Sequence, residues 1–258
     1  MRTVTEVKKL KSGYRVYFDH QDEPINIELD IYFKYHLKLG SSLDEKTFLK
    51  MKAENDELYY MRLGILRLKK MQTEQELAYY LMDKACPKPL VSHLMSFYKT
   101  RNYINDEEYT KNYIELKKYQ QGPQLLKSEL LKKGVDLEII DQYIKTLNQE
   151  DILEKNIAKK LSTYKNKSKR QALNATKTYF LTKGFYSEDV DRILNSQVEK
   201  IEFNDASLLS KTFDQYYQKY KSKKSGYALK ALLKQKLYQK GFELNDIENI
   251  FIDKDVLS

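Results

Sequence analysis

The sequence is poor in residues that cross-link a chain, break its helices or anchor it in a membrane. It contains one cysteine, Cys86, so no internal disulfide bond can form, and four prolines, none of them after Pro123. No stretch approaches the roughly 18–20 consecutive apolar residues of a membrane span. The opening segment MRTVTEVKKLKSGYRVYF alternates polar and apolar residues, unlike the apolar centre of an export signal. A cytoplasmic protein without a membrane segment is therefore expected.

Motifs for catalysis are absent as well. The eight glycines are scattered and form neither GxxxxGK[ST] nor GxGxxG, the loops that cradle phosphates. His20, His36 and His93 are isolated, and a single cysteine leaves no metal-ligand spacing. The acidic clusters at 106–108 and 188–191 fall at predicted helix starts, where carboxylates favour the helix dipole. The sequence predicts a protein that is not an enzyme and uses no cofactor or metal.

Apolar material is limited for a chain of 258 residues. Hydrophobic residues make up 41% of the chain, but that share includes 22 tyrosines, and 32% of the residues are charged. One spherical core would need more apolar residues, so an elongated body of small units is expected. The net charge of +9 favours a polyanionic partner, or a partner already bound to a polyanion, although solubility alone would also account for it.

The N-terminal fifth of the chain differs from the rest. Segments 4–10, 14–18 and 25–29 alternate or are rich in β-branched residues, and turn-forming residues separate them, so two or three short antiparallel strands are predicted. Residues 31–39 predict a helix stopped by a glycine, and residues 43–53 predict a second helix after a serine cap. Beyond this region the pattern is helical.

A short phrase recurs along the helical part. LLKKGV, FLTKGF and LYQKGF each place lysine and glycine before an apolar residue, and a fourth copy has alanine in place of the glycine. We call this position the turn residue; its four occupants are Ala85, Gly134, Gly184 and Gly241. Apolar residues fall mostly one, five, six, nine and ten places after it. The copies lie 49, 50 and 57 residues apart, which is longer than a common two-helix repeat.

A repeat of that length predicts three helices per unit. In the second unit Asn105 is a suitable cap for the first helix, Pro123 suits the first position of the second, and Gly134 supplies the left-handed residue that ends it. Ala85 departs from the pattern, and the prolines that follow it are expected to force that turn another way. The predicted fold is mainly α, with tandem three-helix repeats in an elongated curved array after a small β-rich N-terminal segment. The predicted divisions are 1–55 for the N-terminal strands and helices, then repeat units at 56–105, 106–150, 151–205 and 206–258.

Basic residues gather at one recurring place, near the end of the first predicted helix of each unit. The predicted partner- or DNA-binding residues are Arg67, Lys69, Lys70, Lys117, Lys118, Lys165, Lys167, Lys169, Arg170, Lys219, Lys221, Lys223 and Lys224. If the units stack with constant geometry, these residues line one edge of the array. Tyrosines lie among them as candidates for base stacking or for core packing: Tyr119, Tyr164, Tyr216, Tyr217, Tyr220 and Tyr227. The alternative interpretation is a solvated surface whose lysines only favour the helix dipole.

The most specific segment is NYINDEEYTKNYI (102–114) followed by QGPQLLKSELLKKGV (121–135). It resembles the signature region of the RecX family, bacterial regulatory proteins that modulate RecA. The β-rich start followed by KGF-bearing three-helix units is similar to the longer RecX proteins of low-GC Gram-positive bacteria. The resemblance extends over nearly the whole chain, although Asn102 stands where the family usually has glycine.

The resemblance implies a non-enzymatic modulator of DNA repair and recombination. Such a protein binds the RecA filament on single-stranded DNA along its groove and mostly inhibits RecA's ATPase, strand exchange and co-protease activity. The implied partners are RecA and single-stranded DNA, contacted directly or through the filament, and the chain is expected to be a monomer. The residues themselves leave two alternatives open: a helical-repeat protein that binds nucleic acid independently of RecA, and a protein scaffold that binds through a concave face.

Overall fold

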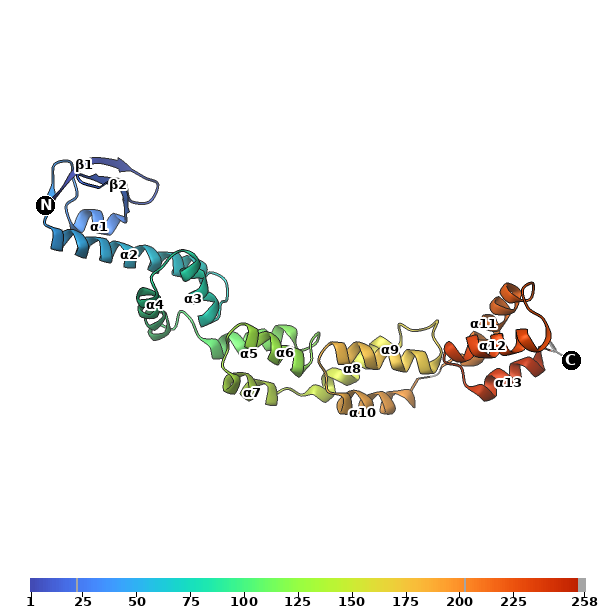
Figure 1. Ribbon diagram of the computed structural model, residues 1–258. Helices are drawn as coiled ribbons and strands as arrows, with labels where there is room; N and C mark the ends of the chain where they lie inside the picture. The colour runs from blue at the N-terminus through green and yellow to red at the C-terminus, as the bar shows by residue number, and fades with distance from the viewer. Residues whose placement is uncertain (22, 202, 255–258) are drawn as a thin grey trace. The chain divides into compact units, whose positions relative to one another are not determined.

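The computed structural model describes residues 1–21, 23–201 and 203–254. In those residues it contains one small sheet and thirteen helices (Figure 1). This mainly helical fold with an N-terminal sheet confirms the predicted fold class. The contacts within the chain divide it into two compact units, one formed by residues 1–109 with 133–136 and the other by residues 110–132 with 137 onward.

The sheet is antiparallel and has the strand order β3-β2-β1-β4. Its strands are β1 (Arg2–Lys9), β2 (Tyr14–Phe18), β3 (Ile25–Ile27) and β4 (Ser42–Leu43). The alternation in the sequence buries Val4, Val16 and Ile27 on one face, where they pack with the neighbouring helices. The first three strands confirm the prediction. The fourth is only two residues long, too short for an alternating pattern to identify it.

The helix α1 (Leu29–Lys34) is shorter than the predicted helix over 31–39. It ends because His36 takes the left-handed conformation, with φ of 50°. The His36 N–H then donates to the carbonyl of Phe33, and the Leu37 N–H donates to the carbonyl of Tyr32. This pair of bonds is the Schellman motif that usually carries glycine. Here a histidine occupies its left-handed position.

The helix α2 (Glu45–Arg67) has an aspartate cap instead of the predicted serine cap. The Asp44 carboxylate accepts the N–H of Thr47 at 2.8 Å. The first half of α2 buries Phe48 and Met51 in the core beneath the sheet. Its second half runs past the expected border between residues 55 and 56 and packs on the helices that follow. One continuous helix therefore serves the sheet and the first helical group.

The other helices form groups of three in chain order. The first group is the second half of α2 with α3 (Glu74–Asp83) and α4 (Lys88–Thr100). The next groups are α5 (Asp106–Lys117), α6 (Pro123–Lys132) and α7 (Leu137–Lys145), then α8 (Gln149–Leu161), α9 (Lys169–Thr182) and α10 (Ser187–Val198), and finally α11 (Asp205–Tyr220), α12 (Gly226–Gln239) and α13 (Leu244–Asp253).

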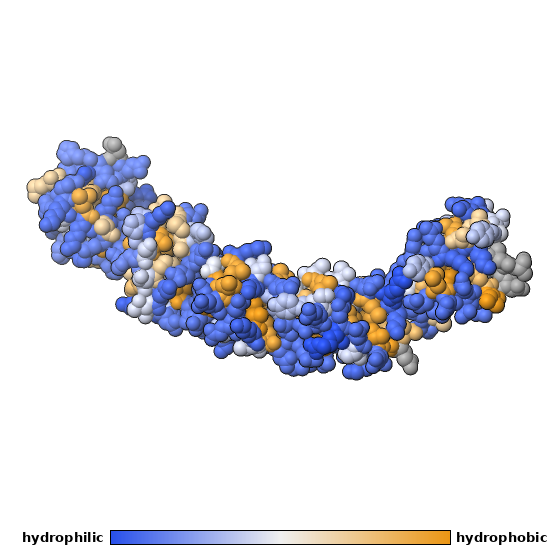
Figure 2. Space-filling view, turned by 60° about the horizontal axis from the view of Figure 1, so that its bottom comes forward, coloured by the Kyte–Doolittle hydropathy of each residue, from blue (hydrophilic) through white to orange (hydrophobic). Residues whose placement is uncertain are grey.

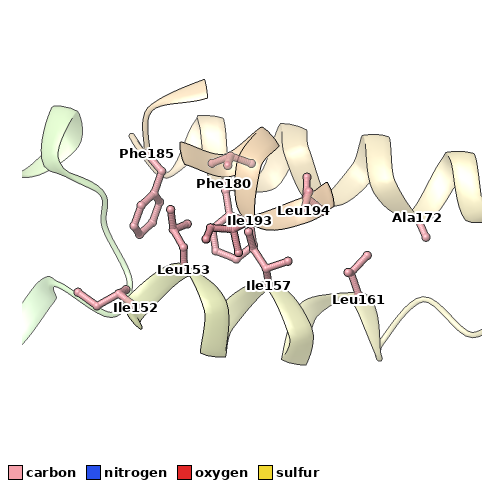
Figure 3. Packing of buried hydrophobic residues seen from close by; sticks show 10 residues of the cluster. Ile152, Leu153, Ile157, Leu161, Ala172, Phe180, Phe185, Ile193 and Leu194 are labelled. Atoms are coloured by element: carbon pink, nitrogen blue, oxygen red, sulfur yellow. The ribbon is translucent and has the colours of Figure 1, made fainter. Parts of the chain in front are cut away.

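In the first, third and fourth groups the helices meet around a small apolar core. Figure 3 shows the core of α8–α10, where Ile157, Phe180 and Ile193 from the three helices point toward one another. A separate core of nine buried residues joins α11, α12 and α13. Residues six and ten places after each turn residue are buried in all four copies, whereas the residue five places after it is partly or fully exposed. The predicted apolar stripe is therefore narrower than the sequence count indicated.

All four turn residues take the left-handed conformation. The φ angles of the three glycines are 80°, 84° and 82°, and that of Ala85 is 64°. The prediction that Ala85 turns another way is wrong, because the Cys86 N–H still donates to the carbonyl of Leu81 at 3.0 Å, as in a Schellman motif. The prolines beyond it instead begin α4, where a missing N–H costs nothing.

Each glycine turn also contacts the start of the second helix of the preceding group. We call this contact between two helix ends a junction. The capping residue of that helix donates a hydrogen bond to the carbonyl of the lysine before the glycine. The three bonds are Thr73 Oγ1 to Lys133 O at 2.5 Å, Gly122 N to Lys183 O at 2.7 Å and Ser168 Oγ to Lys240 O at 2.7 Å. The amide end of one helix thus meets the carbonyl end of the next, so their dipoles are aligned favourably.

The close approach explains why three turn residues are glycine and one is not. A Cβ added to Gly184 would lie 2.5 Å from the backbone nitrogen of Leu125, and one added to Gly241 would lie 2.7 Å from the Ser168 Oγ. Ala85 belongs to the first group, so no earlier group places a helix start against it, and its side chain is exposed. The glycines serve the junction as well as the left-handed turn.

We predict that Gly184→Ala destabilises the protein much more than Gly40→Ala. The two glycines have similar φ angles, 84° and 80°, but a Cβ on Gly40 has nothing within 4 Å. Gly40→Ala should therefore cost only the left-handed strain of about 1–2 kcal/mol. Gly184→Ala should add the overlap with Leu125, for a total of about 2–5 kcal/mol. Urea unfolding of both variants measures the difference, and equal losses would show that the junction does not constrain Gly184.

Candidate partner-binding surface

The predicted basic residues lie at the connection between the first and second helix of each group. Arg67 ends α2, and Lys117 ends α5. The other residues of these clusters lie in the following connections or at the edges of the neighbouring helices. The structure corrects one detail, because Lys165 and Lys167 follow α8 instead of ending it, and Lys169 begins α9.

The position of the third cluster argues against a purely local role. Lys169 and Arg170 occupy the first turn of α9, where the positive end of the helix dipole disfavours cations. The Lys169 N–H is satisfied by both carboxylate oxygens of Asp205, at 3.0 and 3.1 Å. Stabilisation of the start of α9 therefore accounts for the Asp205 carboxylate at this place. It does not account for the positive side chains of Lys169 and Arg170.

Most of the thirteen predicted side chains are available to a partner. Eleven are exposed, whereas Lys117 and Lys118 are partly buried. In the described ranges, Lys118 is the one member of the set in an ion pair, with Glu115 at 2.6 Å. Its hydrogen bond to that carboxylate raises the pKa of Lys118. Figure 2 shows that hydrophilic side chains cover much of the visible face, with smaller hydrophobic patches between them.

The tyrosines among the clusters divide into two kinds. Tyr164 packs against the α8–α10 core, and three others, at 216, 217 and 220, pack against the α11–α13 core. Tyr119 and Tyr227 are exposed, by 59% and 88%. Only the last two present most of their surface to a partner.

Four further lysines were not predicted as binding residues. Lys155, Lys159 and Lys160 lie on α8, and Lys183 follows α9. Together they line two cavities on either side of Tyr119. The predicted clusters lie at the helix connections, whereas three of these four lysines lie inside α8. The spacing of four between 155 and 159, which places two side chains on one helix face, was the available signal.

Two other kinds of site receive no support. Across the described part of the chain, no three His, Cys, Asp or Glu side chains are grouped closely enough to hold a metal ion. Within the same part, no helix combines the length and apolar character that a membrane crossing requires.

We predict that reversing the charge of the exposed lysines in the third cluster leaves the fold intact. The Lys165→Glu/Lys167→Glu variant should change the free energy of unfolding by no more than about 1 kcal/mol, because both side chains are exposed and the ring contact that is lost, between Lys167 and Tyr164 at 5.3 Å, lies at the surface. Arg170→Ala should cost about 0.5–1 kcal/mol, because its guanidinium lies 4.8 Å from the centre of the Tyr238 ring. Urea unfolding followed by circular dichroism tests both. A large loss in the double variant would assign the lysines a structural role.

The comparison with known proteins gives a consistent result. No family model matches the chain. It is 28% identical over 251 residues to the regulatory protein RecX of Streptococcus agalactiae, covering 95% of this chain and 97% of that protein. It is 29% identical over 257 residues to the same protein of Streptococcus mutans, covering 95% and 97%. The regulatory protein RecX of Bacillus cytotoxicus is 28% identical over 263 residues, covering 96% of each.

Solved structures show the same fold. A crystal structure of regulatory protein RecX superposes with a TM-score of 0.57 and 20% identity, covering 76% of this chain and all of that one. A crystal structure of RecX from Lactobacillus salivarius gives a TM-score of 0.53 and 22% identity, covering 57% and 99%. The predicted resemblance to the RecX family is confirmed: the chain is similar to regulatory proteins RecX over 95–96% of its length.

Proposed function

We propose that this protein binds the RecA filament assembled on single-stranded DNA and lies along its groove. It restrains RecA's ATP hydrolysis, strand exchange and co-protease activity without catalysing a reaction itself. The curated relatives are named regulatory proteins, and the RecX resemblance implies RecA as the partner. In this proposal the protein acts as a cytoplasmic monomer that needs no cofactor.

The observation that carries the proposal is the repeated placement of exposed cations. A cluster recurs at the same connection in every helical group, and twelve of its thirteen members in the described residues have no ion-pair partner. A filament that contains DNA carries negative charge at regular intervals. Several modest contacts on one chain add through their high effective concentration. The binding should therefore be tight and should weaken as salt rises.

We predict that the wild-type protein suppresses the DNA-dependent ATPase of its cognate RecA at near-stoichiometric concentration. Lys165→Glu/Lys167→Glu should need roughly tenfold more protein for the same suppression, because two cations facing the partner are reversed. The matched control is Lys50→Glu/Lys52→Glu, which makes the same charge change at exposed positions of α2, outside the clusters. A titration of RecA on single-stranded DNA at fixed ATP measures all three proteins.

The results separate this proposal from its alternatives. No suppression by folded wild-type protein over a wide concentration range would refute a role on RecA. Equal loss in the cluster variant and the control would mean that net charge, and not the cluster, governs the effect. Full suppression that persists at high salt would instead favour a scaffold that binds through uncharged contacts.

A further inference from the structure

Two cavities lie side by side along the seam between α5, α8 and α9, and Tyr119 lines both. The larger, about 450 Å³, is lined by the end of α5, the turn after α7 and the start of α8. The smaller, about 240 Å³, is lined by α8, the end of α9 and the turn that contains Tyr119. The Tyr119 ring is 59% exposed. The backbone carbonyl of Tyr119 accepts a hydrogen bond from the Asn156 side-chain amide (Nδ2) at 3.1 Å. This bond holds the turn against α8.

The smaller cavity is strongly basic. Lys159, Lys160 and Lys183 line it, and no carboxylate does. The Nζ of Lys160 lies 4.2 Å from the centre of the Tyr179 ring, and that of Lys183 lies 5.7 Å from the same centre. Two ammonium groups thus converge on one ring without a counter-charge among the residues that line the cavity. An anion placed between them would relieve their repulsion.

Lys183 lacks the ion pair that the equivalent lysine of the preceding junction forms. Lys133 occupies the equivalent place before the preceding turn residue and pairs with Glu76 at 2.6 Å, a contact that raises the pKa of Lys133 to about 12. Glu76 is the third residue of α3, and the third residue of α6 is Leu125. Lys183 therefore has no carboxylate across its own junction, and its ammonium remains available to a ligand.

The larger cavity has a more balanced charge. Lys111 and Lys155 line it without an ion-pair partner in the described residues, whereas Glu115 pairs with Lys118. The carboxylate of Asp151 accepts the side-chain amide of Asn148 at 2.8 Å. Lys155 and Lys159 are both exposed and lie four residues apart on α8, about 6 Å along its axis. Cations therefore continue from one cavity to the other past the Tyr119 ring.

We propose that these two cavities form a subsite for single-stranded nucleic acid. One unpaired base stacks on Tyr119, and the neighbouring phosphates contact Lys160 and Lys183 on one side and Lys155 on the other. An exposed ring flanked by cations suits a single strand, since every base has a face that can stack and every nucleotide carries a phosphate. The inference deepens the proposed function and rests on it only for identifying the strand as the DNA within the filament.

We predict that Tyr119→Ala weakens binding of the full-length protein to a fluorescent 20-nucleotide oligothymidylate by roughly tenfold or more. The matched control is Tyr79→Ala, which removes a tyrosine of similar exposure, 58%, that lies outside the basic clusters and lines neither cavity. Lys160→Gln/Lys183→Gln should make the slope of log affinity against log salt less steep by about 1.4, since each lost phosphate contact contributes about 0.7 for single strands. Fluorescence anisotropy over a series of salt concentrations measures both, and urea unfolding confirms that each variant is folded.

The outcomes distinguish this subsite from the proposed function. Absence of oligonucleotide binding by the wild-type protein at low salt would overturn the subsite, and so would equal binding by Tyr119→Ala and wild type. Variants that bind the oligonucleotide normally but fail to restrain RecA would assign the cavities to an acidic protein surface, which also overturns it. Conversely, normal oligonucleotide binding that depends on Tyr119, in a protein without effect on RecA, would support the subsite while refuting the proposed function.

Discussion

The hydrogen bond that closes each helical junction is the contact on which the remaining architecture depends. A capping group at the start of one helix donates to the carbonyl that precedes the next turn residue, in three places along the chain. The approach is close enough to exclude a Cβ at Gly184 and Gly241. It therefore fixes which residues are glycine, and it joins helix ends of opposite partial charge. The turn cannot change its residue type without moving the neighbouring group.

The same junction is built with different side chains each time. Asp106 accepts the N–H of Glu74, the first residue of α3, at 2.9 Å, and Asp205 accepts that of Lys169 at the start of α9. The first residue of α6 is Pro123, which has no N–H to satisfy. Gln149 begins α8, whereas α5 and α11 begin with aspartate. The acidic residue is thus present where a helix start needs an acceptor, and absent where proline has removed the need.

The sequence predicted the helical groups, their turns and the places where basic residues gather, because periodicity and turn chemistry are local. It failed where a residue took a conformation outside its usual preference, as His36 and Ala85 do at left-handed positions. It could not predict the junction bonds, since a carbonyl acceptor has no residue type and Ser168 lies 72 residues from its partner Lys240. For the same reason it could not tell which lysines are free. Lys133 and Lys183 stand at equivalent places in the sequence, and only the structure shows that Glu76 neutralises the first.

The distribution of apolar residues explains how a modestly hydrophobic chain presents several clusters of exposed cations. The α8–α10 and α11–α13 groups each have their own core, and the junction between them uses a hydrogen bond, a close backbone approach and the contact of Arg170 with the Tyr238 ring. Little apolar surface is therefore needed to join the groups, which leaves the helix connections free to be polar. Exposed cations at these connections cost little stability, because they are solvated and mostly unpaired. In the proposed mode of binding, several of these cations act together on a partner that carries repeated negative charge, since each contact alone is weak and screened by salt. The composition and the proposed mode of binding are thus consequences of the same modular construction.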